Sequence, residues 1–534
     1  MQIENKFQRV ALVSSGQVHY TRPPAGVAFM AGVCEKNNIE YEIFDLNVLF
    51  KEEFGHDAWS RSYVLNNRTD LLGTPEDLLK MLDDFFTGIC EKIQSMEAEV
   101  VAMTCLTFQQ HLWAEMFLEK VKKLLPGVVT IIGGPGVDSP ANTKWLNRDE
   151  TDTSELFGTY LTNQGYVDYY VLGEGDIIFD KFLQGHRDGL PGLNRRGDVP
   201  TKQPQIDDLD VLPIPSYRKF NFNHYLGNLE RPVVSITGSR GCVRRCTFCD
   251  IGHHWKNFRF RSGKNIAEEM FKHYSEKGIT DFFFNDSLMN GSFKQFFDFM
   301  EHLHDLQNKN PGFRDIRYSG QLILRPKTSH SERMFELLSI TGGELFQIGI
   351  ESGSEAVRDH MKKKFSNDDI YWHFEMSEKY KISNWIFITT GYPTETLRDF
   401  QDTLDMYTNL QKYLLNDIIK GTSMVTTMGI LANTPLNLMM SEMGIVYRHD
   451  ESIPSLWYNH NNPELDEHEK YRRWVVLTKH VLSLGYPVSG DIKRDLLRNL
   501  NVYETTLIDN FDYKKPQKSV IPISLASINT SMQS

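Results

Sequence analysis

Short β-rich runs alternate with amphipathic stretches along the first third of the chain. Five runs have the β-branched and aromatic composition of strands, over residues 9–15, 41–47, 100–105, 128–134 and 166–176. Residues 25–38 and 111–125, which lie between these runs, place apolar side chains at helical spacing. Strands that alternate with helices in this way pair in parallel, so we predict an α/β fold with helices on both faces of a parallel sheet.

The alternation resumes after a segment rich in Pro, Gly and Asp. The second series of predicted strands covers residues 231–239, 281–286, 316–324, 345–352 and 385–391. A helix is predicted over residues 264–278, with Gly278 as its C-cap. From residue 435 the pattern is mixed, with one amphipathic helix over residues 467–485 and a Ser-rich tail after Tyr513 that we predict to be loose.

These changes of pattern divide the chain into four predicted parts. They are a Rossmann-like domain over residues 1–185, a linker over residues 186–230, a second β/α domain over residues 231–434 and a mixed, mostly helical region over residues 435–534. In a doubly wound sheet, ligands bind at the carboxyl ends of the strands. Glycines and small polar residues mark these ends in the first domain, at residues 14–16, 104–107, 133–136 and 173–175.

Composition and charge narrow the class of protein. The formal net charge of −12 and the pI near 5.8 argue against nucleic acid as the main partner, because phosphate binding requires a basic face. The apolar run near the N-terminus, residues 10–13, is too short for a secretion signal, and no stretch reaches the 18 apolar residues of a membrane span. We therefore expect a cytoplasmic protein with no membrane span, in which thiols stay reduced.

Three of the six cysteines crowd into the segment GSRGCVRRCTFCD, as Cys242, Cys246 and Cys249. With His253 they could form a structural zinc site, which takes four ligands in a closed tetrahedron. They could equally hold an iron–sulfur cluster through three thiolates, which leaves one iron open for a ligand. The triplet follows a predicted strand and no second Cys or His pair follows at finger spacing, so the pattern favours the cluster.

A Cys-x3-Cys-x2-Cys triplet just after the first strand of a β/α unit resembles the radical S-adenosylmethionine (SAM) superfamily. The resemblance implies a partial (β/α)6 TIM-type barrel in which Cys242, Cys246 and Cys249 are the catalytic cluster ligands of a [4Fe–4S] cluster. The open iron would chelate SAM, and one electron from the cluster would cleave it to a 5′-deoxyadenosyl radical. The segments FFFNDS, IGIESGSE and FITTGYPTETLRDF also resemble family motifs, although Thr394 stands where the family's turn has a second glycine. The SAM contacts implied by the resemblance are Phe248, Asn285, Asp286, Gln321, Arg325, Glu351 and Ser352.

The first domain resembles the cobalamin-binding domain that precedes many radical SAM barrels. The matching stretches are residues 22–47, 100–108, 131–138 and 167–176, and the linker segment IDDLDVLPIPSY also matches. The cobalamin contacts implied by the resemblance are Thr104, Cys105, Gly133, Gly134, Pro135, Gly173, Glu174 and Gly175. The Asp-x-His-x-x-Gly pattern that supplies a lower axial histidine is absent. Cobalamin would then bind without that histidine, or the domain has lost the cofactor.

Together these resemblances imply a cobalamin-dependent radical SAM C-methyltransferase of the class B type. Its reducing partner would be a protein such as flavodoxin or ferredoxin, and its small-molecule or peptide substrate is not identified by any motif. Two alternatives stay open. One is a radical SAM enzyme that cyclises, rearranges or oxidises its substrate, with or without cobalamin. The other is a binding protein without catalytic activity, stabilised by zinc or by a cluster.

Overall fold

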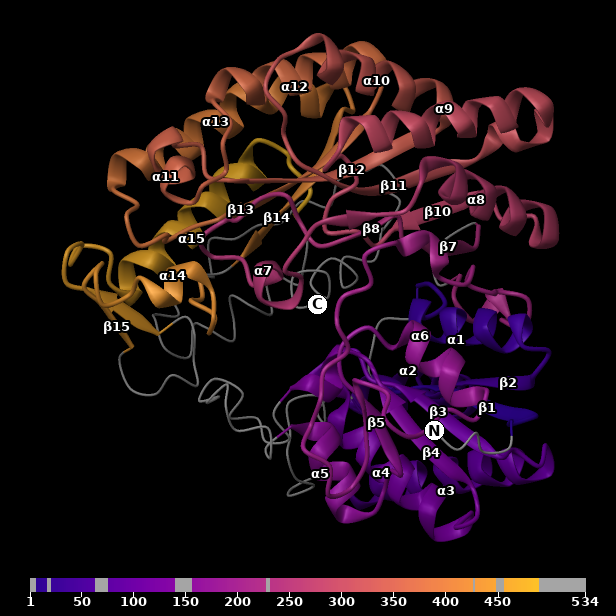
Figure 1. Cartoon of the computed structure of the whole chain (residues 1–534). Coiled ribbons are helices and arrows are strands. Elements are labelled where there is room, and N and C mark those ends of the chain that lie inside the picture. The colour runs from indigo at the N-terminus through magenta and orange to yellow at the C-terminus, as the bar shows by residue number, and fades with distance from the viewer. Residues whose placement is uncertain are drawn as a thin grey trace.

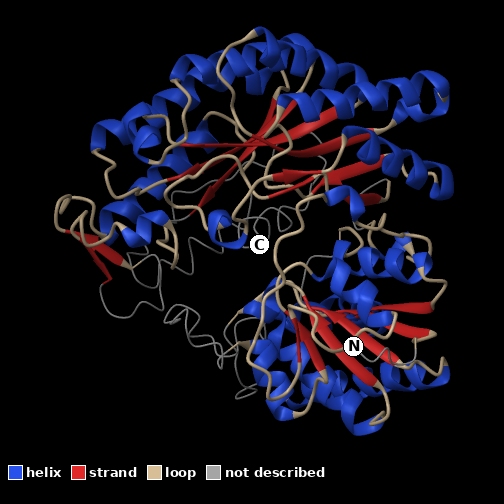
Figure 2. Cartoon of the chain, viewed as in Figure 1, coloured by secondary structure: helices blue, strands red, loops and turns tan. Residues whose placement is uncertain are grey.

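Two six-stranded, largely parallel sheets organise the chain, one in each half (Figures 1 and 2). The structure is a computed structural model that describes residues 6–16, 21–62, 75–139, 156–226, 231–425, 428–447 and 456–488. No helix in these ranges is long and apolar enough to cross a membrane. The predicted alternation of strands and helices is confirmed in both halves.

The first sheet has six strands in the order β2-β1-β3-β4-β5-β6. The strands are β1 (Arg9–Ser14), β2 (Glu40–Asp45), β3 (Val100–Thr104), β4 (Val129–Gly133), β5 (Tyr169–Val171) and β6 (Leu193–Asn194). All neighbours are parallel except β5 and β6. The order 2-1-3-4-5 is that of flavodoxin-like doubly wound sheets, whose ligand crevice lies where the strand order reverses, between β1 and β3.

Helices cover both faces of this sheet. The helices are α1 (Ala25–Lys36), α2 (Leu46–Ser62), α3 (Glu76–Ser95), α4 (His111–Leu124), α5 (Phe157–Gln164) and α6 (Gly175–Leu183). Successive side chains of a strand point to opposite faces, so Val10 and Leu12 enter the core under α1 and α6. Ala11 and Val13 enter the other core, under α2 to α5. The strand predicted over residues 166–176 corresponds to β5, which covers only Tyr169–Val171 because α6 begins soon afterwards at Gly175.

The second sheet is six-stranded and parallel throughout, in the order β14-β13-β12-β11-β10-β7. Its strands are β7 (Val233–Ile236), β10 (Asp281–Phe284), β11 (Arg317–Leu322), β12 (Gly343–Glu351), β13 (Ser383–Thr389) and β14 (Ile419–Val425). Because β7 and β14 are the two edges, this is the predicted partial (β/α)6 barrel. The sequence pattern had not indicated β14, in which Lys420 and Gly421 interrupt the apolar run.

Five long helices cover the outer face of the barrel, in the arc at the top of Figure 1. They are α8 (Gly263–Lys277), α9 (Phe293–Lys309), α10 (Ser329–Thr341), α12 (Asn367–Tyr380) and α13 (Leu397–Leu415). Each begins after a Ser or Thr whose hydroxyl accepts the N–H of the residue three positions on, and such a cap stabilises a helix by about 1 kcal/mol. The N-cap residues are Ser262, Ser292, Thr328, Ser366 and Thr396. Gly278 ends α8 in the left-handed conformation, which confirms the predicted C-cap.

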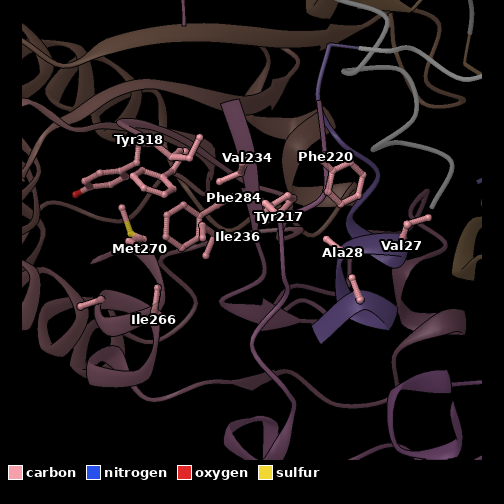
Figure 3. Close-up of a cluster of buried hydrophobic side chains, with 14 of the residues drawn as sticks. Val27, Ala28, Tyr217, Phe220, Val234, Ile236, Ile266, Met270, Phe284 and Tyr318 are labelled. Carbon is pink, nitrogen blue, oxygen red and sulfur yellow. The ribbon is translucent and has the colours of Figure 1, made fainter. Parts of the chain in front are cut away.

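One apolar cluster joins the two halves (Figure 3). Val27 and Ala28 of α1 belong to the same cluster as Tyr217 and Phe220 of the linker. The cluster continues into the barrel through Val234, Ile236, Ile266, Met270, Phe284 and Tyr318. Since α1 contacts β7, the first domain covers an edge strand that would otherwise offer unpaired backbone groups.

The C-terminal region contains α14 (Pro435–Leu438), β15 (Ile445–Tyr447), β16 (Trp457–Asn459) and α15 (Glu467–Ser483). Helix α15 confirms the helix predicted over residues 467–485 and packs against α13 and β14. The antiparallel pair β15–β16 was not predicted, so the described part of this region mixes strand and helix. The Ser-rich tail lies outside the described residues.

The contact between α1 and the linker can be tested at Gly32. A methyl group on its Cα would lie 2.2 Å from the carbonyl oxygen of Ile214. We predict that Gly32→Ala destabilises the protein by about 1–3 kcal/mol, because the linker backbone must move. Gly88 in α3 has no atom within 4 Å of the same position, so Gly88→Ala is the control and should stabilise by about 0.5–1 kcal/mol. Urea unfolding measures both, and equal effects would contradict the described packing.

Candidate active site

The three clustered cysteines lie on one loop at the mouth of the barrel. Strands β8 (Ser239–Arg240) and β9 (Arg259–Phe260) pair antiparallel and form its base. We call residues 241–258, between these strands, the cluster loop; it includes the short helix α7 (Ile251–His254). Gly241 opens the loop with φ 87°, and a side chain there would meet the carbonyl oxygen of Asn257 at 2.6 Å. Glycine is therefore required where the two ends of the loop come together.

The thiols of the cluster loop are partly buried and form no disulfide. Burial raises the pKa of all three, that of Cys249 to about 12, so they ionise only when a cation replaces their protons. Within the described residues, no three His, Cys, Asp or Glu side chains are close enough together to enclose a single metal ion. A four-iron cluster differs from a zinc site in that each thiolate binds a different iron. The side chain of His253 lies outside the described set.

A buried ion pair faces these thiols. Glu351 ends β12 in the left-handed conformation, φ 68°, and its Oε1 lies 3.1 Å from Nζ of Lys363. The same Nζ lies 5.7 Å from the centre of the Phe248 ring. Burial alone would lower the pKa of Lys363, but Glu351 and the thiol of Cys246 outweigh it and raise that pKa. Lys363 could not be recognised from the sequence, because it is the middle residue of a Lys-Lys-Lys run and carries no motif of its own.

The two polar residues that follow β10 have different surroundings. Asp286 is buried and accepts hydrogen bonds from the backbone N–H of Gly238 and the hydroxyl of Ser239, both at 2.8 Å. Burial raises the pKa of Asp286 to about 7, although these hydrogen bonds oppose the change. Asp286 thus holds the base of the cluster loop. Asn285 is exposed and accepts a hydrogen bond from the Thr237 hydroxyl at 3.0 Å.

Other predicted SAM contacts lie at the ends of β11 and β12. The side-chain amide of Gln321 donates to that of Gln347 at 3.4 Å. Arg325 donates to the carbonyl oxygen of Gly291 at 2.6 Å and stacks at 5.0 Å from the Phe293 ring. Ser352 is fully buried, and its hydroxyl accepts the N–H of Ser354 at 3.2 Å. These three side chains therefore have protein partners in the structure.

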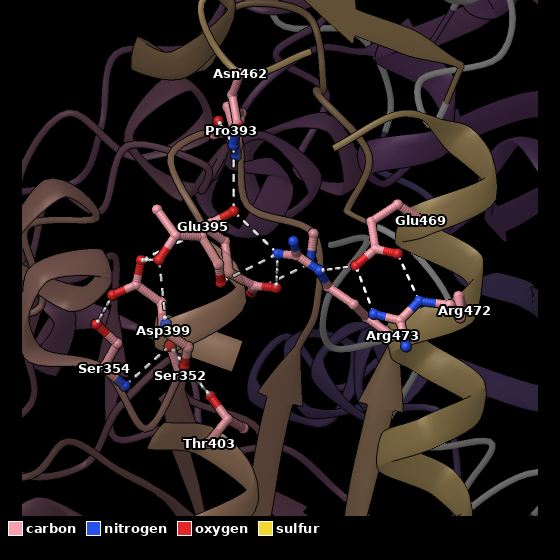
Figure 4. A network of polar contacts seen from close by, with 12 residues as sticks. Ser352, Ser354, Pro393, Glu395, Asp399, Thr403, Asn462, Glu469, Arg472 and Arg473 are labelled. Carbon is pink, nitrogen blue, oxygen red and sulfur yellow. Dashed lines mark hydrogen bonds and ion pairs between the residues drawn. The ribbon is translucent and has the colours of Figure 1, made fainter. Parts of the chain in front are cut away.

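A polar network joins Ser352 to the C-terminal helix (Figure 4). Ser354 donates to Asp399 at the start of α13, and Arg473 of α15 lies 2.8 Å from a carboxylate oxygen of Glu395. Glu395 belongs to the turn after β13 that resembles the family's glycine-rich turn. Burial raises the pKa of Glu395 to about 7 even though Arg473 opposes it. The network fixes the mouth of the barrel to the C-terminal region.

The crevice of the first domain is lined by tightly packed backbone. Cys105, which follows Thr104 at the end of β3, is fully buried, and burial raises the pKa of its thiol. Gly134 has φ 106°, and a side chain there would meet the carbonyl oxygen of Cys105 at 2.4 Å. Gly133 and Pro135 flank it in the same loop after β4. Gln110, which no sequence motif indicated, donates to the carbonyl oxygens of Ser15 and Gly16 and joins the loops after β1 and β3.

The segment after β5 bears directly on the barrel. Gly173 has φ 88° where the chain turns, and Gly175 begins α6. Glu174 lies between them. Its side chain is 2% exposed and binds Arg259 through both carboxylate oxygens, at 2.8 and 2.9 Å. Arg240 lies 3.0 Å from Glu174 and also pairs with Asp176. The Glu174 carboxylate, predicted as a cofactor contact, is thus turned toward the two arginines at the base of the cluster loop.

Comparison with known proteins identifies the family of the barrel domain. Residues 236–407 match the family model described as "Radical SAM superfamily". This part of the chain is a radical SAM domain. Such a domain takes a [4Fe–4S] cluster and SAM, and the three free thiols of Cys242, Cys246 and Cys249 are the groups that would hold the cluster.

The curated relatives differ in how much of this chain they cover. The cytidylyl-2-hydroxyethylphosphonate methyltransferase of Streptomyces wedmorensis is 23% identical over 415 residues, 67% of this chain and 68% of that protein. The anaerobic magnesium-protoporphyrin IX monomethyl ester cyclase of Cereibacter sphaeroides is 25% identical over 228 residues. That match covers 40% of this chain and only 34% of the cyclase.

Solved structures share the fold of both halves. The radical SAM methyltransferase TsrM from Kitasatospora setae, solved with tryptophan and a SAM analogue, has a TM-score of 0.64 at 16% identity and covers 90% of each chain. The cobalamin-dependent radical enzyme OxsB, solved with aqua-cobalamin, has a TM-score of 0.60 at 14% identity. It matches 93% of this chain and 71% of its own. The first domain and the radical SAM domain therefore occur together in a known architecture.

The buried contact between Glu174 and the barrel arginines predicts a large effect of a neutral side chain. Glu174→Gln removes the negative charge and leaves Arg259 buried without its charge partner, which should lower the free energy of unfolding by about 3 kcal/mol. Asp180 lies on α6, the helix that follows Glu174, but pairs with Lys36 of its own domain, which is largely exposed, so Asp180→Asn should cost below about 1 kcal/mol. Denaturant unfolding compares the variants, and equal losses would contradict the assigned role of Glu174.

Asp286 predicts a pH dependence of stability. Its pKa in the folded protein, about 7, lies above the ordinary value of 3.8, so the folded state favours the protonated form. Its contribution to stability is full below pH 4 and is lost as the pH rises through 7. We therefore expect the stability of the wild type relative to Asp286→Asn to fall between pH 4 and 7. Unfolding of the cluster-free protein measures this, and a constant difference would show that Asp286 titrates normally.

Proposed function

We propose that the protein is a cobalamin-dependent radical SAM C-methyltransferase. One observation carries the proposal. Glu174, which follows β5 of the flavodoxin-like sheet, binds the two arginines at the base of the cluster loop and so joins the carboxyl end of that sheet to the three thiols. Similarity in fold to TsrM and OxsB along both halves of the chain supports it. When bound, the cluster and SAM supply one-electron cleavage of SAM, and cobalamin supplies a transferable methyl group.

In this proposal the chain positions the reactants. Cys242, Cys246 and Cys249 hold the cluster, while Lys363 and Glu351 offer SAM a buried cation and an acceptor beside Phe248. The loops after β1, β3 and β4 of the first domain would receive the corrin, since Gly134 and its neighbours bring backbone close to the crevice. Cys105 is too deeply buried to react and serves packing.

The setting of the reaction follows from the same chemistry. We propose a cytoplasmic location, because the cluster loop requires reduced thiols, and a protein such as flavodoxin or ferredoxin as electron donor. We propose that residues 1–185 form the cobalamin domain, residues 186–230 the linker, residues 231–434 the barrel and residues 435–534 the C-terminal part. The substrate would be a small molecule or peptide reached through the barrel mouth.

A second candidate is a radical SAM enzyme that does not methylate. The observation in its favour is the similarity to the magnesium-protoporphyrin IX monomethyl ester cyclase, which spans 40% of the chain. The two candidates share the cluster and SAM and differ in the products that SAM gives.

Anaerobic reconstitution followed by product analysis tests the proposal. We expect about four irons and four sulfides per chain, cobalamin in the extract, and both 5′-deoxyadenosine and S-adenosylhomocysteine from SAM. Cys246→Ala should lose iron and SAM cleavage together, whereas Cys90→Ala, on α3 of the first domain, should keep both. Deoxyadenosine without S-adenosylhomocysteine would support the second candidate. One zinc per chain and no iron would contradict both.

A further inference from the structure

Four basic side chains surround the tip of the cluster loop. We call Arg245, Lys256, Lys362 and Lys364, together with the apolar Val243, the basic patch; all five are exposed, Val243 by 42%. Arg245 donates to the carbonyl oxygen of Lys256 on one side of the tip. On the other side, the neighbouring Arg244 donates to the carbonyl oxygen of Lys364 at 3.5 Å. The tip is therefore bracketed by Lys256 on one side and by Lys362 and Lys364 on the other.

The charges of the basic patch are not neutralised by the protein. None of its four cations forms an ion pair within the described part of the chain, although the whole chain carries a net charge of −12. Two carboxylates lie close in sequence to residues of the basic patch. Asp250 lies 3.7 Å from Nε2 of His254, and Asp359 is exposed on α11 (Glu355–His360). A positive patch of this kind on an acidic protein attracts acidic partners.

The cluster itself does not require these four side chains. Two other cations, Arg244 and Lys363, are more buried and lie within electrostatic reach of Cys246. Buried charges at that range act strongly on the thiolates, whereas exposed charges are weakened by solvent and salt. The outer four cations therefore face solvent, where a partner can meet them.

We propose that the basic patch docks an acidic one-electron carrier protein that reduces the cluster. This rests on the proposed function, because only a cluster held by the three cysteines needs that electron. One electron leaves the reduced carrier and enters the oxidised cluster, and no bond forms or breaks. A small charged patch around one exposed apolar residue suits such a partner, since electron-transfer encounters are weak and bury less than about 1,200 Å². A nucleic acid is less favoured because the patch is short and the chain is acidic.

Charge reversal tests the docking surface on the reconstituted full-length protein. Among the described residues, Lys256 and Lys364 contribute only backbone carbonyl oxygens to the hydrogen bonds of the loop, so Lys256→Glu with Lys364→Glu is the test variant. The matched control, Lys123→Glu with Lys277→Glu, makes the same charge change on exposed residues of α4 and α8. Stopped-flow absorbance follows bleaching of the cluster by reduced flavodoxin, and separately by dithionite.

We expect the test variant to be reduced by flavodoxin at least about tenfold more slowly at low salt, because steering by opposite charges is lost. The difference should shrink as salt is added, and the control should match the wild type. Dithionite, which needs no docking surface, should reduce all three proteins at the same rate. Equal flavodoxin rates for test variant and wild type would overturn the proposal.

A binding measurement separates this proposal from the function on which it rests. Fluorescently labelled flavodoxin should bind the cluster-free wild type and control with equal affinity and the test variant about tenfold more weakly. If dithionite bleaches no cluster, the proposed function fails, and this measurement still decides the docking surface. Loss of binding to a labelled single-stranded RNA, with flavodoxin binding unchanged, would assign the patch to nucleic acid instead and overturn the proposal.

Discussion

The geometry of the whole molecule depends on one buried carboxylate. Glu174 belongs to the first domain, and both arginines that it binds belong to the short strands at the base of the cluster loop. Taking such charges out of water costs several kcal/mol for each ion, and the cost is recovered only when the geometry is good and the remaining donors are satisfied. Both oxygens of Glu174 are used, and the indole of Trp255 lies 5.3 Å from the guanidinium of Arg259. A small rotation of one domain against the other would break this arrangement.

The apolar cluster between the domains complements the ion pair. Burial of Val27, Ala28, Tyr217 and Phe220 against β7 stabilises the association but has no strong directional preference, since apolar packing tolerates small shifts. The carboxylate and its arginines supply the direction. The crevice of the first sheet and the cluster loop are consequently held at a fixed separation, as the proposed chemistry between two cofactors would require.

The sequence indicated most strands because their β-branched runs are continuous, as in Val100–Thr104 and Val129–Gly133. It missed β14, in which a lysine and a glycine interrupt the run, and the two-residue β6, which is too short to show a period. The cysteine triplet could be recognised because its ligands are close in sequence. The roles of Glu174, Asp286 and Lys363 could not, because each depends on a partner from another strand or domain. Periodicity reports which side of an element is buried and carries no information about such distant pairs.

The covered edge of β7 has a consequence for how this architecture can diversify. A full eight-stranded barrel closes on itself, whereas this one stops at six strands and leaves β7 as an edge that α1 of the first domain covers. The first domain is therefore part of the barrel's wall as well as a domain with its own core. Exchange of that domain between relatives by recombination would succeed only if the new α1 and linker also matched the old edge. We therefore expect the two halves to be inherited as a pair, with variation in substrate left to the loops and to the C-terminal region.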